Sequence, residues 1–214
     1  MKKLITAIVC AASLSSFAQN TKPGFDGASW KAPYSLATPG GWSVERSVLS
    51  TEKANRIPYK GVEDLRLTPG WNNPTSEEYW TYASLWYFDG INKPDEETIE
   101  HDLNSYFTGL LNKNIETQKI PARKILPVKT WITELKNENG DSKTFYGAVA
   151  MLDYKEQMPI SLNCLVHVRL CPGQNKTFVF YEFSPKPLND KVWKSLDQLW
   201  LDFNVISNQP YSTN

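Results

Sequence analysis

Two segments of the chain carry apolar residues at the spacing of a helix. The first follows Pro94, where Asp95, Glu96 and Glu97 fill a first turn that tolerates proline and whose dipole favours acids. Apolar residues then recur every three or four positions: Ile99, Leu103, Tyr106, Phe107, Leu110 and Leu111. This pattern predicts a helix from about residue 95 to 112. A second stripe predicts a last helix that begins near Asn189-Asp190, and it consists of Val192, Trp193, Leu196, Leu199, Trp200 and Phe203.

Most of the remaining chain is divided by proline, glycine and asparagine into short runs typical of strands. The runs cover about residues 43–50, 62–68, 78–89, 129–137, 143–153, 160–170 and 177–183. Asn139-Gly140 supplies the positive-φ residues of a tight hairpin. The order of elements predicts an α+β fold, with an antiparallel sheet of about 6–7 strands. One helix is inserted after the third strand, and one C-terminal helix packs on the sheet.

The first eighteen residues have the pattern of a secretory signal peptide. Lys2 and Lys3 precede a short apolar run, Leu4 to Leu14, and Ser16-Phe17-Ala18 is a small-x-small cleavage signature. The run is too short to span a bilayer about 30 Å thick. We therefore expect cleavage after Ala18 and export to the periplasm or the exterior.

No linker rich in proline, serine or glycine divides the rest of the chain. Residues 19–41, rich in proline and glycine, are predicted to form an irregular leader. We expect a single α+β domain over residues 42–207 and a tail over 208–214.

The charges of the chain cancel, with 23 Lys plus Arg against 23 Asp plus Glu. A nucleic-acid partner would call for a basic excess, so none is expected. No apolar segment after the signal is long enough for an integral membrane span. The expected partner is an unidentified protein or a small-molecule or glycan ligand.

Cys164 and Cys171 are the cysteines left after signal cleavage. On one extended strand, seven steps of about 3.3 Å separate their α-carbons by roughly 23 Å, too far for a disulfide. Seven is also odd, so the side chains point to opposite faces. The sequence predicts two unpaired thiols.

Signatures of catalysis are missing from the sequence: it has no G-x-S-x-G, Walker, H-E-x-x-H or G-x-G-x-x-G motif. Two histidines cannot supply a histidine-rich zinc site, whereas a calcium site built from carboxylates stays open. No metal ligand, cofactor or catalytic residue is assigned. His101 is predicted on a solvated helix face. His167 and Arg169 lie two residues apart and so share the polar face of a predicted strand, where the pair is either simply exposed or able to bind an anion.

Aromatic residues are concentrated between positions 71 and 88, namely Trp71, Tyr79, Trp80, Tyr82, Trp86, Tyr87 and Phe88. Both faces of this predicted strand are largely apolar, so it is expected to be central and covered on both sides. Trp71 lies in a turn of proline, glycine and asparagine. It either folds back onto the core or presents a stacking surface for sugars, quaternary amines or bases.

A polar edge precedes this cluster, from Tyr59 through Glu63 and Asp64 to Arg66. On a strand, Asp64 and Arg66 point the same way. They form either a satisfied ion pair or a polar cleft in which Arg66 receives a carboxylate or phosphate. The candidate ligand-binding residues are therefore Tyr59, Glu63, Asp64, Arg66 and Trp71.

Residues 57–71, IPYKGVEDLRLTPGW, and 77–82, EEYWTY, resemble a signature of uncharacterised exported bacterial proteins. The order of strands, helix, meander and closing helix is similar to the fold shared by photosystem PsbP and Mog1 proteins. That second resemblance implies a non-catalytic interaction module and assigns no binding residue.

We therefore expect an exported, non-catalytic ligand- or protein-binding module. The alternative is a carboxylate-dependent hydrolase that acts on cell-envelope or extracellular material. Such an enzyme needs two acids about 5 to 10 Å apart, and Glu45, Glu63 and Asp64 are the candidates.

Overall fold

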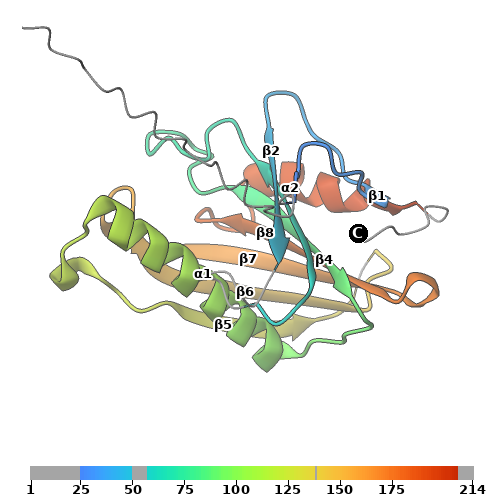
Figure 1. The fold of residues 1–214 in the computed structure, drawn as a ribbon. Coiled ribbons are helices and arrows are strands. Elements are labelled where there is room, and N and C mark those ends of the chain that lie inside the picture. The colour runs from blue at the N-terminus through green and yellow to red at the C-terminus, as the bar shows by residue number, and fades with distance from the viewer. Residues whose placement is uncertain (1–24, 50–56, 138, 207–214) are drawn as a thin grey trace, which may run out of the picture.

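A computed structural model describes residues 25–49, 57–137 and 139–206. Seven strands form one antiparallel sheet in the order β2-β3-β4-β8-β7-β6-β5, and β1 pairs with β9 in a separate two-stranded sheet (Figure 1). The strands are β1 Tyr34–Ser35, β2 Ser43–Leu49, β3 Gly61–Leu67, β4 Tyr82–Asp89, β5 Lys129–Leu135, β6 Lys143–Asp153, β7 Met158–Cys171, β8 Lys176–Ser184 and β9 Asn204–Val205. The helices are α1 Glu96–Gln118 and α2 Val192–Leu201, with short 3₁₀ turns at Ala122–Lys124 and Pro172–Gln174.

This architecture confirms the predicted α+β class, with α1 after the third strand of the large sheet and α2 near the C-terminus. On the central strands β4 and β8, alternate residues enter two separate apolar clusters. α1 lies along β5 and β6 and closes the first cluster, which includes Trp86, Tyr106 and Tyr181. α2 packs against β8 and closes the second, which includes Phe180 and Trp200. The sheet is therefore covered on both faces.

The central strand β4 is buried on both faces, as its sequence predicts. It begins at Tyr82 and not at residue 78, because the chain before it forms turns. Trp80 has a φ of +54°, and its N–H donates to the Trp71 carbonyl at 2.9 Å. Trp80 is nevertheless buried in the cluster beneath α1. The aromatic run thus belongs to the core, but only its second half is strand.

Two element boundaries extend beyond their predicted limits. α1 continues to Gln118. The apolar stripe predicted an earlier end, because the last turns of the helix are mostly polar and exposed and carry no stripe of their own. Strand β7 begins at Met158 and includes Pro159. Proline fits there because β8 pairs with β7 only from Asn163 onward, which leaves Pro159 a single neighbouring strand.

Most of the predicted leader, together with Cys164 and Cys171, lies within the described residues, whereas the chain ends do not. Part of the predicted leader packs on the domain, since Tyr34 in β1 is buried in the cluster beneath α2. The predicted signal, residues 1–18, and the tail, 208–214, lie outside the described residues. Cys164 and Cys171 are free, as predicted. Within the described residues, neither helix has the length and apolarity to cross a bilayer.

Candidate functional site

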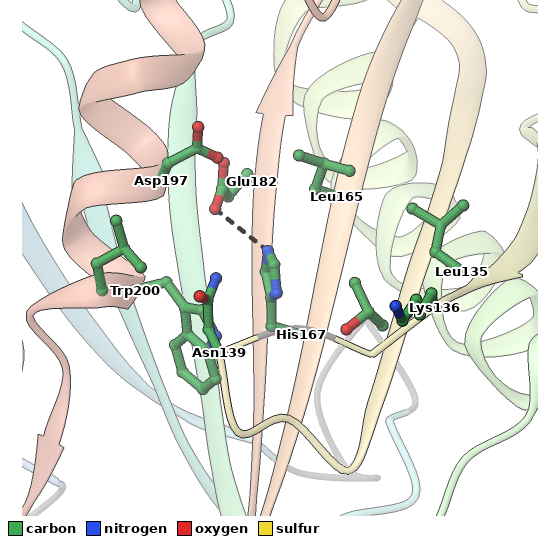
Figure 2. A pocket seen from close by; sticks show the side chains of 10 residues that line it. Leu135, Lys136, Asn139, Leu165, His167, Glu182, Asp197 and Trp200 are labelled. Atoms are coloured by element: carbon green, nitrogen blue, oxygen red, sulfur yellow. Dashed lines mark ion pairs between the residues drawn. The ribbon is translucent and has the colours of Figure 1, made fainter.

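A cavity of about 510 Å³ opens between the sheet and α2. Its floor comes from β7 and β8 and its wall from α2, while the end of β5 and the following turn form the opposite rim (Figure 2). Leucines make its apolar parts, and acids and a histidine make its polar centre. The lining residues are Leu135, Lys136, Asn139, Thr144, Leu165, His167, Glu182, Asp197, Trp200 and Leu201.

Asp141 anchors one side of the polar centre. It follows Asn139 and Gly140, whose φ angles of +54° and +77° confirm the predicted hairpin turn. The Asp141 carboxylate contacts His167 Nδ1 at 2.7 Å and accepts a hydrogen bond from Trp200 Nε1 at 2.9 Å. Asp141 therefore holds both the histidine on β7 and the tryptophan on α2.

His167 Nε2 faces the buried Glu182, and 3.5 Å separate it from Oε1 in the ion pair that Figure 2 marks with a dashed line. This distance is long for a hydrogen bond. Burial opposes a charge on His167, but its contacts with Asp141 and Glu182 outweigh burial and raise its pKa to about 9. The imidazole is therefore a cation at neutral pH.

Glu182 is completely buried, and burial raises its pKa to about 7. The positive charge of His167 opposes this shift, whereas the neighbouring Asp197 adds to it. Asp197, half-buried on α2, points its carboxyl toward Glu182 (Figure 2). Among the described residues, no N–H or hydroxyl group donates to either Glu182 oxygen. Glu182 therefore exchanges a proton near neutral pH and has unused acceptor capacity.

The prediction that His167 lies on an exposed strand face is wrong. His167 is only 8% exposed, because α2 covers this side of the sheet. Arg169 stacks over the Trp200 ring, with 4.2 Å between its guanidinium carbon and the ring centroid. Phe180 stacks on the same indole at 5.1 Å between centroids. Trp200 is therefore a wall of the site and offers no free ring face to a ligand.

Asp64 and Arg66 point to the same side of β3, as predicted, and are almost fully buried. Their side chains form an ion pair, and Arg66 also donates to the carbonyls of Leu36 and Ala37. Tyr34 and Arg46 complete the set around Asp64, at 3.0 and 3.1 Å. Of the two arrangements considered from the sequence, the geometry is that of a satisfied buried pair.

Glu63 and Tyr59 lie in the half of the molecule that α1 covers. Glu63 is buried and accepts a hydrogen bond from Ser84 Oγ at 3.0 Å. Burial raises its pKa, and hydrogen bonds from its neighbours limit the rise. The Tyr59 hydroxyl donates to Asp102 at 2.6 Å, beside an open hollow of about 320 Å³ on α1. The five predicted residues thus do not form one site.

Trp71 is half-buried and packs against the cluster beneath α1. Lys155 Nζ lies 3.9 Å from the centroid of its ring. Of the two predicted arrangements, Trp71 folds back toward the core, and the cation that covers its ring belongs to the protein.

No group of three or more His, Cys, Asp or Glu side chains arranged to hold a metal ion occurs in the described part of the chain. Comparison of the chain with protein-family models and with curated proteins gave no match.

Proposed function

We propose that this protein is an exported binding module that takes a small hydroxylated ligand, of the sugar or polyol class, in the cavity beneath α2. The observation that carries the proposal is the row His167–Glu182–Asp197 at the centre of the cavity. It places a cationic N–H donor beside the Glu182 carboxylate, whose acceptor capacity the described residues leave unused. A hydroxyl group both accepts and donates a hydrogen bond, so it matches this combination.

Size and charge support the same ligand class. A volume of about 510 Å³ lies within the range of small-molecule sites, roughly 300–1,000 Å³. The charges of Asp141, His167, Arg169 and Asp197 offset one another, and Glu182, whose pKa is raised to about 7, adds only a partial negative charge at neutral pH. Asp197 is the half-buried member of the row, and its carboxyl points toward the buried Glu182 (Figure 2), so it is the acid that a ligand hydroxyl meets first.

The hydrolase alternative receives less support. The Asp197 carboxyl points directly at Glu182 and helps to raise its pKa (Figure 2), whereas acids that cleave a glycosidic bond stand about 5 to 10 Å apart with the substrate between them. Glu63 and Asp64 are consecutive on β3 and point to opposite faces of the sheet. Export is proposed on the signal pattern of residues 1–18, and the resemblance to the PsbP and Mog1 fold agrees with a non-catalytic module.

Saturation-transfer NMR tests the proposal, with methyl glycosides of glucose, galactose and N-acetylglucosamine as probes. At least one probe should receive saturation from the wild-type protein. Asp197→Asn should weaken that binding about tenfold, the equivalent of about 1.4 kcal/mol. Asp202→Asn is the matched control, because this exposed acid follows α2 and does not line the cavity. Equal behaviour of the two variants, or no transfer to any probe, would refute the proposed site.

A further inference from the structure

A second cluster lies beneath the other face of the sheet, where four aromatic rings surround the ammonium group of Lys155. The distances from Nζ to the ring centroids are 3.9 Å for Trp71, 4.7 Å for Trp80, 5.4 Å for Tyr79 and 6.0 Å for Tyr154. Trp71, Tyr79 and Trp80 come from the turns before β4, and Tyr154 and Lys155 come from the β6–β7 hairpin. We call these four rings the aromatic cage.

The ammonium group inside the cage is poorly matched to it. Nζ is buried and has no hydrogen-bond partner among the described residues. The nearby Asp153 carboxylate is already engaged, because it accepts from the Tyr79 hydroxyl at 2.7 Å and from the Lys155 backbone N–H at 2.9 Å. A primary ammonium has three N–H donors that lose water here without replacement. A quaternary ammonium has no N–H donor, so it keeps the cation–π attraction without this loss.

Space for a ligand adjoins the cage. A cavity of about 200 Å³ shares three cage residues, Trp71, Trp80 and Tyr154. Its remaining lining is apolar or aromatic, except for the carboxylate of the exposed Glu45. A cation in this cavity therefore meets aromatic faces and one carboxylate.

The backbone at Trp80 gives an independent indication. A φ of +54° is unusual for a bulky aromatic residue, and the other non-glycine residues with positive φ in the described chain are lysine, asparagine and glutamine. Strain of this kind is concentrated at functional sites. Here it aims the Trp80 ring at the cage while its N–H binds Trp71.

We propose that the aromatic cage is a binding site for a quaternary ammonium group, such as that of choline, and that Lys155 occupies it as an intramolecular substitute which the ligand displaces. Lys155 lies in a hairpin turn, so its side chain can leave the cage without rearrangement of the sheet. This site lies on the opposite face of the sheet from His167 and does not depend on the function proposed for that cavity.

Isothermal titration calorimetry with choline tests the proposal, with ethanolamine as the matched ligand that lacks the methyl groups. Lys155→Ala should bind choline at least tenfold more tightly than the wild type and should prefer choline over ethanolamine. Lys124→Ala is the control variant, because Lys124 bonds Gln157 of the same hairpin from outside the cage and its loss should leave choline binding unchanged. Adding Trp71→Ala to Lys155→Ala should abolish the gain.

A folded Lys155→Ala protein that binds choline no better than the wild type, or binds ethanolamine equally well, would overturn the proposal. The wild type supplies a second measurement that requires no variant to fold. Burial lowers the pKa of Lys155 to about 8 inside the cage, and release into solvent returns this pKa toward its ordinary value of 10.5. Displacement by choline therefore takes up a proton, so choline should bind more tightly at pH 7 than at pH 9.5. The other titratable groups around the cage are Asp153, Glu156, Glu45 and the hydroxyls of Tyr79 and Tyr154, and burial raises the pKa of both tyrosines. Unchanged binding across this range would also contradict the proposal.

Discussion

Replacement of Arg66 by methionine tests whether the buried pair on β3 is structural. Arg66 is 1% exposed and bonds Asp64 and three backbone carbonyls, so the substitution leaves several buried groups without a donor. Breaking a buried ion pair on one side costs roughly 3–5 kcal/mol. Asp64 keeps Arg46 and Tyr34 as partners, which lowers this cost. Each orphaned carbonyl adds about 1 kcal/mol or more.

We therefore expect Arg66→Met to lower the free energy of unfolding by about 4 kcal/mol. For a domain of this size, that loss corresponds to a fall in Tm of roughly 10 °C. Urea denaturation followed by tryptophan fluorescence measures the change, with an unaltered m-value as the check that the native and unfolded states are comparable.

Two further variants separate charge pairing from side-chain volume. Arg46→Met removes an arginine whose side chain is 22% exposed, and it should cost about 1 kcal/mol. The double variant Asp64→Asn/Arg66→Met removes the uncompensated charge, so it should recover part of the loss. An Arg66→Met protein within about 1 kcal/mol of the wild type would refute the structural role and would favour the ligand-binding alternative for this arginine.

Three other perturbations test the fold and the site. The pKa of His167 is raised from 6.5 to about 9, so the charged imidazole adds at most about 3 kcal/mol to the free energy of unfolding. This contribution is complete below pH 6.5 and is lost as the pH rises to 9. Urea denaturation at several pH values should show the fall, and His167→Gln should flatten it. Gly61→Ala should destabilise by about 2 kcal/mol, because its Cβ would lie 2.0 Å from the Tyr87 carbonyl oxygen, whereas Gly173→Ala, with nothing within 4 Å, should change the melting temperature little. Iodoacetamide should label half-buried Cys171 in the native protein but Cys164, which is fully buried, only after unfolding; peptide mapping that finds native labelling at Cys164 would contradict the packing of β7.

The spacing of apolar residues predicted the fold well, because most strands and both helices bury a regularly spaced row of apolar side chains in one of the two clusters. It failed for His167, since a polar strand face predicts solvent only where no other element covers it. The last helix was predicted, but the sequence does not say which face of the sheet it covers. In the structure α2 lies over β8 and turns a polar face into the floor of a cavity.

The two acids at the centre of the cavity, Glu182 and Asp197, did leave signals in the sequence. On β8, period two places Glu182 on the same face as Phe178 and Phe180, which is unusual for an unpaired acid. On the last helix, Asp197 lies four residues after Trp193 and three before Trp200, at the margin of the apolar stripe. Neither residue is near the other in sequence, so only the packing of α2 on β8 brings them together.

Glu182 and Glu63 are both buried glutamates in the sheet, but of the two only Glu63 receives a hydrogen bond from a described side chain. If Glu182 is retained for a ligand, the free protein bears its desolvation cost, and an apolar residue of similar volume should relieve it. Glu182→Met should therefore raise the free energy of unfolding at pH 8 by about 1–3 kcal/mol and abolish glycoside binding, while His167 keeps Asp141 as its partner. Glu63→Met should instead destabilise by about 1–3 kcal/mol, because it leaves the Ser84 hydroxyl without its acceptor. Parallel urea titrations of the two variants decide the matter: equal destabilisation would mean that Glu182 is as well satisfied as Glu63 and has no capacity left for a ligand.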